Sequence, residues 1–170
     1  MMKRDIKQIK INKNYYNKYT NEVTQIKNIY KFPNCEFLHI GSTSIENSLG
    51  EEIIDILVIV DNLHEITNFD EKRLNNIKYH RVAHNNKGLI SYCKIVDFNS
   101  MNYDVKLFIV QKDSKVYNEF IKFNNYLLEN NLIFEYYQNF KKDNLELKNN
   151  PKEYFKQQKI FINKILKEEK

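Results

Sequence analysis

The feature that most constrains the fold is an apolar run, Ile53 to Val60, that carries a single carboxylate at Asp55. A run of this length, rich in β-branched residues, indicates a strand buried in a sheet and is too short to span a membrane. An ionised side chain in such a strand costs free energy unless neighbouring groups compensate it. Asp55 therefore needs either a structural partner or a functional role.

Two interpretations of Asp55 are open. In the first, the carboxylate lies at a sheet end and is bound by backbone amides or by a lysine. In the second, it forms one site with the preceding turn, Gly41-Ser42-Thr43-Ser44. Gly41 lets the backbone approach an anion closely, and the hydroxyls and the N–H groups of a following helical turn favour phosphate. A carboxylate on the adjacent strand could then hold Mg²⁺ against that phosphate.

The sequence HIGSTSI at residues 39–45, followed by IIDILVIV from residue 53, resembles the signature of the GrpB family. That signature reads HIGSTSVPGL, then Ala-Lys-Pro, then IID and apolar residues. The family is placed with the nucleotidyltransferase superfamily of the DNA polymerase beta type, whose pattern adds an Asp on a later strand. The resemblance implies that Asp55 and Asp104 are catalytic and ligate Mg²⁺. It also implies that Gly41, Ser42, Thr43 and Ser44 hold the phosphates of a nucleoside triphosphate.

Two lysines complete the set of candidate phosphate-binding residues. Alternation along the strand 103–108 puts Asp104, Lys106 and Phe108 on one face, so Asp104 and Asp55 could share a divalent ion if their strands are neighbours. Lys141 ends a stretch, residues 137–141, that is similar to the family's Tyr-x-x-Leu-Lys. The structural alternatives are an Asp–Lys pair on an exposed strand face and a solvated lysine.

The chain also departs from the family pattern. Its spacer, residues 46–52, lacks the family's prolines and lysine, and Leu57 stands where the wider superfamily has a second metal-binding Asp. Asn124 and Asn125 replace the Arg and Asp of the family's Phe-Arg-Asp-Tyr-Leu. These departures favour an alternative to nucleotidyl transfer, a catalytically degenerate module that binds a nucleotide or phosphometabolite. Fusion of such domains to dephospho-coenzyme A kinase makes coenzyme A metabolism a plausible setting, and whether the chain is an enzyme stays open.

Periodicity and turn residues predict the order of elements. Apolar spacing predicts a helix over 14–31, a short helix over 63–67 and helices after Ser114, one of them started by Pro151. Strands are predicted at 35–40, 53–60, 79–83, 89–96 and 103–110, with hairpin loops at 84–88 and 97–102 and an edge strand or arm within 1–11. We therefore expect one α/β (α+β) domain over 1–170. Its nucleotidyltransferase-like mixed sheet of about five strands has an N-terminal helix and a C-terminal helical layer, with helices mainly on one side.

Composition limits the class of protein. With 170 residues, 42% of them hydrophobic, the chain can bury the core of one domain. The net charge of +5 is spread along lysine-rich segments without an RNA-binding signature, so nucleic acid is not the expected partner. Cys35, Cys93 and the four histidines form no metal-spaced set, and no signal segment is evident. We expect a cytoplasmic protein without a membrane partner, and the sequence leaves its oligomeric state open.

Overall fold

The structure is a computed structural model that describes residues 7–8, 13–83 and 87–168. Its strands are β1 (Lys7–Gln8), β2 (Cys35–Ile40), β3 (Leu49–Gly50), β4 (Ile54–Val60), β5 (Tyr79–Ala83), β6 (Leu89–Asp97) and β7 (Asn102–Gln111). Its α-helices are α1 (Lys13–Lys27), α2 (Leu63–Thr67), α3 (Lys72–Asn76), α4 (Lys115–Glu129), α5 (Asn131–Asp143) and α6 (Pro151–Glu168). Two 3₁₀ turns are η1 (Ser42–Ser44) and η2 (Leu145–Asn149).

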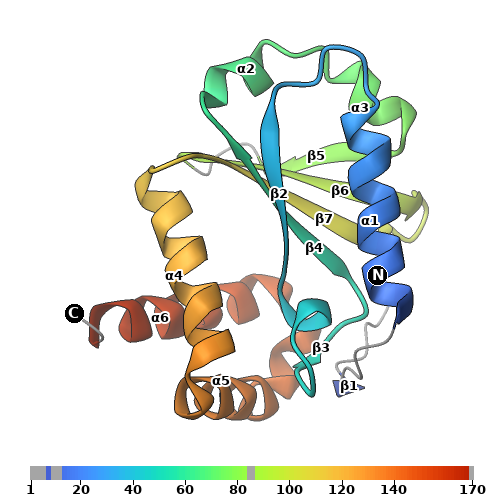
Figure 1. Cartoon of the computed structure of the whole chain (residues 1–170). Coiled ribbons are helices and arrows are strands. Elements are labelled where there is room, and N and C mark those ends of the chain that lie inside the picture. The colour runs from blue at the N-terminus through green and yellow to red at the C-terminus, as the bar shows by residue number, and fades with distance from the viewer. Residues whose placement is uncertain (1–6, 9–12, 84–86, 169–170) are drawn as a thin grey trace.

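A five-stranded mixed sheet in the order β2-β4-β7-β6-β5 forms the centre of the molecule (Figure 1). The central pair β4–β7 is parallel, and the other three neighbouring pairs are antiparallel. In β4 and β7, Asp55 lies beside Lys106 in the pairing register. The expected α/β fold class, with its N-terminal helix and C-terminal helical layer, is confirmed.

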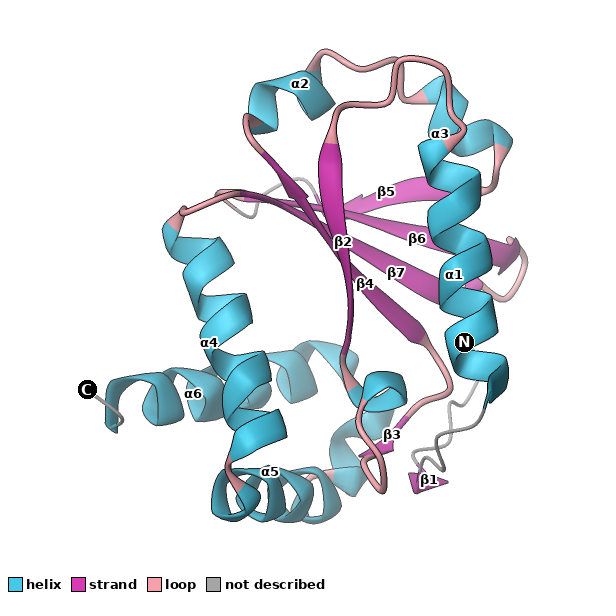
Figure 2. Ribbon diagram, viewed as in Figure 1, coloured by secondary structure: helices cyan, strands magenta, loops and turns pink. Residues whose placement is uncertain are grey.

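Helices cover both faces of this sheet (Figure 2), so the expectation of helices mainly on one side is wrong. On one face, Ile54, Ile56 and Val58 pack in a core with Val23 and Ile26 of α1. On the other face, the intervening residues of β4 pack with side chains of α4, among them Leu57, Ile59, Val116 and Phe120. The reason is visible in the sequence, because a central strand that is apolar at consecutive positions must be covered on both faces.

Most predicted elements are confirmed to within a few residues. The strand 35–40 and the helix 63–67 have the predicted bounds, whereas the first helix ends at Lys27, four residues before its predicted end. Helix α3 forms in a charged segment for which no helix was predicted, and it buries Leu74. The predicted edge strand within 1–11 is described only at Lys7–Gln8, and residues 84–86 of the predicted loop lie outside the described residues. No helix in the described ranges combines the length and apolarity needed to cross a bilayer.

His39 links β2 to helix α1 and to the Gly-Ser turn. Its ring stacks on Tyr19 with the ring centroids 4.9 Å apart, and its Nε2 lies 3.0 Å from Thr43 Oγ1. The Tyr19 hydroxyl donates to the carbonyl of Phe37 at 3.0 Å. Burial lowers the pKa of His39 from 6.5 to about 4, because the packed ring is poorly placed to carry a charge.

We therefore expect His39 to make the fold sensitive to acid. The unfolded chain binds a proton near pH 6.5 and the folded chain only near pH 4, so stability is lost as the pH falls through this window. His39→Gln should reduce the loss in unfolding free energy between pH 7 and pH 4 by about 2 kcal/mol, allowing for the solvent that still reaches the ring. Urea denaturation across this pH range measures the difference.

His64→Gln, which replaces an exposed histidine of α2, is the matched control for this measurement. If the unfolding free energy of the wild type and of His39→Gln depends on pH in the same way, His39 is not the cause of the acid sensitivity.

Candidate functional site

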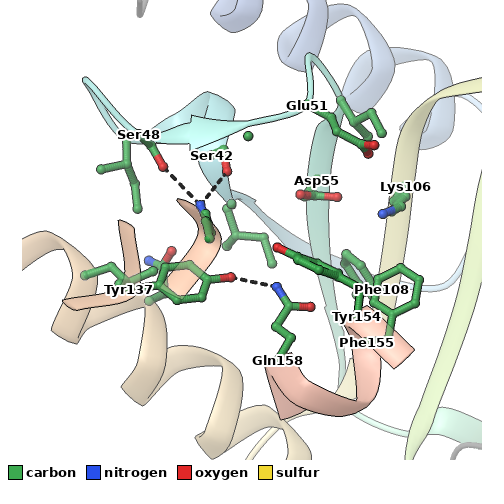
Figure 3. Close-up of a pocket in the computed structure, with 18 of the residues that line it drawn as sticks. Ser42, Ser48, Glu51, Asp55, Lys106, Phe108, Tyr137, Tyr154, Phe155 and Gln158 are labelled. Carbon is green, nitrogen blue, oxygen red and sulfur yellow. Dashed lines mark hydrogen bonds between the residues drawn. The ribbon is translucent and has the colours of Figure 1, made fainter. Parts of the chain in front are cut away.

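A cavity of about 580 Å³ lies between the β4–β7 part of the sheet and helices α4, α5 and α6 (Figure 3). This volume falls within the range of small-molecule sites. Most of its wall is apolar. The aromatic side chains in it come from β7 and the three helices: Tyr103, Phe108, Phe120, Phe123, Tyr137, Tyr154 and Phe155. Four charged side chains share the lining, namely Glu51, Asp55, Lys106 and Lys141.

Asp55 reaches this cavity from β4 and is pressed against the backbone of Gly41. A Cβ on Gly41 would lie 2.4 Å from Asp55 Oδ2, and the φ of Gly41 is +77°. Only glycine therefore fits, for reasons of both space and backbone conformation. Asp55 Oδ1 is buried without a hydrogen-bond partner among the described residues. Burial raises the pKa of Asp55, although the positive charge of Lys106 opposes this shift.

Lys106 stands beside Asp55 on the neighbouring strand β7. Burial, the largest single effect, would lower the pKa of this lysine, but Asp55 together with Tyr103, Cys93 and Glu51 outweighs burial and the pKa is raised. Its ammonium nitrogen lies 5.3 Å from the ring centroid of Tyr103 and 5.7 Å from that of Phe155, distances typical of cation–π contacts. Within the described part of the chain no hydrogen bond or ion pair joins Lys106 to an acceptor, and Figure 3 shows its nitrogen facing the cavity near Asp55.

Lys141 enters the same cavity from α5 but is occupied by the protein. Its ammonium donates to Ser42 Oγ at 3.0 Å, to Ser48 Oγ at 3.3 Å and to the carbonyl of Leu49 at 2.5 Å. Three acceptors match the three N–H donors of a lysine. Burial lowers the pKa of Lys141 to about 7, against the opposing charge of Asp55. This lysine therefore ties α5 to the Gly-Ser turn.

The hydroxyls of the Gly-Ser turn donate hydrogen bonds to backbone carbonyls in and near the turn. Ser42 Oγ donates to the carbonyl of Leu49 at 2.9 Å, and Thr43 Oγ1 donates to that of Ile53 at 3.0 Å. Ser44 Oγ donates to the carbonyl of Gly41 at 2.8 Å. The predicted helical turn is present as η1, but of its three residues only Ser42 lines the cavity. The phosphate-binding role of Thr43 and Ser44 stays a prediction.

Asp104 does not join the cavity, so the expected common face of Asp104, Lys106 and Phe108 is wrong. Lys106 and Phe108 line the cavity, whereas the carboxylate of Asp104 pairs with Lys18 of α1 at 2.7 Å. The cause is a β-bulge: successive residues of β6, Lys94 and Ile95, pair with Val105 and Tyr103, so Asp104 is the extra residue of β7. A bulge breaks the alternation of side chains along a strand.

The structure thus brings together five of the eight predicted site residues, Gly41, Ser42, Asp55, Lys106 and Lys141. It does not bring Asp55 and Asp104 into one cavity, and no group of three His, Cys, Asp or Glu side chains in the described ranges could hold a metal. The residues present therefore do not form the expected two-carboxylate Mg²⁺ site. A divalent cation at Asp55 alone stays a prediction.

Several cavity residues carry no signal that the sequence interpretation used. Gln158 of α6 donates from Nε2 to the Tyr137 hydroxyl at 2.7 Å, which fixes α6 against α5 across the cavity. Ser48 is buried and accepts from Lys141. Tyr137 and Tyr154 fall at helical spacing, which is the same for aromatic residues that face a core and for those that face a cavity, and Phe155 carried no prediction.

The contact between Gly41 and Asp55 leads to a stability prediction. Gly41→Ala should lower the free energy of unfolding by about 3 kcal/mol or more. The new methyl group would overlap the carboxylate of Asp55, and the positive φ of residue 41 is strained for alanine. Gly88→Ala is the matched control, because Gly88 has φ +79° but the atom nearest to a new Cβ, Val116 Cγ2, would lie at 3.2 Å and would have to move much less. It should cost only about 1–2 kcal/mol.

Guanidinium denaturation of both variants and of the double variant Gly41→Ala/Asp55→Ala measures the effect. The double variant should recover at least about 1 kcal/mol relative to additivity, because its overlap is gone. Equal losses at both glycines with full additivity would contradict the proposed contact.

Comparisons with known proteins agree on one family. The family model described as GrpB protein matches residues 5–168. The glutamate-rich protein GrpB of Alkalihalophilus pseudofirmus is 30% identical over 146 residues, which cover 85% of this chain and 79% of that protein. The crystal structure of the conserved protein GrpB from Enterococcus faecalis has a TM-score of 0.78 at 26% identity and covers 96% of both chains.

A looser likeness is to the Cid1 poly(U) polymerase with MgGTP bound, at a TM-score of 0.44 and 15% identity over 70% of this chain and 39% of that one. The family model, by contrast, spans nearly the whole chain and the relatives named GrpB match it almost throughout. The chain belongs to the GrpB family.

Proposed function

We propose that the chain binds a phosphorylated small molecule in the cavity, with a nucleotide as the leading candidate. The single observation that supports this proposal is the state of Lys106. Its ammonium lacks an acceptor within the described residues, although the side chain is only partly exposed in the cavity wall. A partly desolvated charge without a hydrogen-bonded partner is costly, and a phosphate oxygen would supply the missing acceptor.

The rest of the cavity suits the organic part of such a ligand. Apolar and aromatic side chains line most of the wall, and the head groups of Glu51, Asp55 and Lys106 lie near one another in one part of it (Figure 3). Ligand sites commonly combine an apolar wall with a few placed polar groups. An aromatic base would fit against Tyr154 and Phe155 of α6 while the phosphate contacts Lys106. Binding in this mode needs no pair of metal-ligating carboxylates. It corresponds to the catalytically degenerate binding module, the alternative that the departures from the family pattern favour.

Mg²⁺-dependent nucleotidyl transfer is the second candidate, and the unpartnered Oδ1 of Asp55 is the observation that favours it. A divalent cation would satisfy this oxygen, and Glu51 is the other carboxylate in the cavity wall. Asp104 would not take part, because Lys18 binds its carboxylate outside the cavity. The acceptor of such a transfer stays open.

Calorimetric titration can separate the two candidates. The ligands are ATP, GTP, CTP and UTP, their monophosphates and dephospho-coenzyme A, each with Mg²⁺ and with EDTA. Metal-free binding should weaken by about tenfold or more in Lys106→Met, which removes the charge and keeps the bulk. It should persist in Asp55→Asn.

Lys112→Met is the control, because this exposed lysine follows β7 outside the cavity. Binding that requires Mg²⁺ and disappears in Asp55→Asn would instead support nucleotidyl transfer. Absence of binding for every ligand, or binding that ignores Lys106→Met, would overturn the proposed function.

A further inference from the structure

The charges of the cavity wall limit how much negative charge a ligand can bring. The four charged lining residues are two carboxylates, Glu51 and Asp55, and two lysines, Lys106 and Lys141, so their formal charges cancel. A triphosphate would add several negative charges next to two carboxylates. In a poorly solvated cavity each uncompensated charge is costly.

Lys141 cannot contact the phosphates directly, because its donors are already used. All three of its N–H groups have acceptors in the protein, two serine hydroxyls and the carbonyl of Leu49. Ser42 Oγ is likewise committed, since it donates to the same carbonyl and accepts from Lys141. Breaking this network to bind phosphate would remove the hydrogen bonds of Lys141 that connect α5 to the Gly-Ser turn. Among the described residues that line the cavity, Lys106 is therefore the lysine whose N–H donors are available to a ligand.

Asp55 faces this cation without pairing to it. The two residues are register partners on neighbouring parallel strands, yet no ion pair joins their head groups, and Asp55 Oδ1 lacks a partner within the described residues. Figure 3 shows both head groups side by side at the cavity. One spare donor group thus lies next to one spare acceptor. A ligand that satisfies both must offer a single anionic group together with a hydrogen-bond donor such as a hydroxyl.

Resting on the function proposed above, we infer that the cavity selects a monophosphate ester with a hydroxylated, aromatic body, a nucleoside monophosphate, over the corresponding triphosphate when no metal is present. A phosphate monoester carries about −1.5 to −2 charges at pH 7, of which one ammonium offsets about half or somewhat more, whereas the further phosphates of a triphosphate add charge that no other contact offsets. A ribose hydroxyl donates to Asp55. The base lies against the aromatic side chains of α6.

The test is a metal-free calorimetric series that varies only the number of phosphates. Adenosine, AMP, ADP and ATP, and the equivalent guanine, cytosine and uracil series, are titrated into the full chain in EDTA. For the base that binds, the monophosphate should bind about tenfold or more tightly than both the nucleoside and the triphosphate. Lys106→Met should remove the preference of monophosphate over nucleoside, and Lys112→Met should keep it. Asp55→Asn, which removes a negative charge, should reduce the ratio by which the monophosphate binds more tightly than the triphosphate.

The outcomes separate this inference from the function on which it rests. A triphosphate that binds as tightly as the monophosphate, with both weakened by Lys106→Met, would overturn the inference and leave the proposed function standing. A monophosphate preference that survives Lys106→Met would also overturn the inference. Absence of binding for every nucleoside and nucleotide would remove the nucleotide as ligand and the inference with it. Circular dichroism of each variant confirms that a lost signal is not lost folding.

Discussion

The close approach of Asp55 to the backbone of Gly41 is the contact on which the site depends. It requires a residue without a Cβ at the end of β2, and it fixes the turn that follows against the neighbouring strand β4. This turn also places Ser42 where it accepts a hydrogen bond from Lys141, which connects α5 to the sheet. A carboxylate inside an apolar strand is thus part of the packing as well as a candidate ligand-binding group. The contact agrees with the interpretation in which Asp55 and the Gly-Ser turn form one site, whereas no described group pairs with Asp55 Oδ1.

The sheet separates two sets of charges, although Asp104 of one set and Lys106 of the other are near neighbours in the sequence. On the cavity face, Asp55 and Lys106 lie side by side without an ion pair. On the α1 face, Asp104 binds Lys18, and Glu22 accepts from Lys94 at 2.7 Å. Paired groups of this kind are stabilised by the protein itself, whereas unpaired groups in a cavity offer their hydrogen-bonding capacity to a ligand. The bulge at Asp104 therefore decides which carboxylates are available for chemistry.

Local patterns predicted the parts of the structure that local forces determine. The strands around residues 35–40 and 53–60, the helical turn after Gly41 and the helix begun by Pro151 all follow from propensity, periodicity and turn residues. The side of the sheet on which Asp104 lies depends on how β7 pairs with β6, and no alternation within β7 reveals a bulge. The three acceptors of Lys141 come from residues 42, 48 and 49, far from it in the sequence, so the connection that it makes between α5 and the Gly-Ser turn could not be inferred from its own segment. The aromatic cavity wall was hidden because core-facing and cavity-facing aromatic stripes have the same helical spacing.

The most direct test of the central claim is a crystal structure of the protein grown with a nucleoside monophosphate at millimolar concentration. If Asp55 and Lys106 lie unpaired in order to bind a ligand, a phosphate oxygen will lie within hydrogen-bonding distance of Lys106 Nζ, a ligand donor at Asp55 Oδ1 and a base against the aromatic residues of α6. An empty cavity in which Lys106 closes onto Asp55 as a direct ion pair would contradict the central claim.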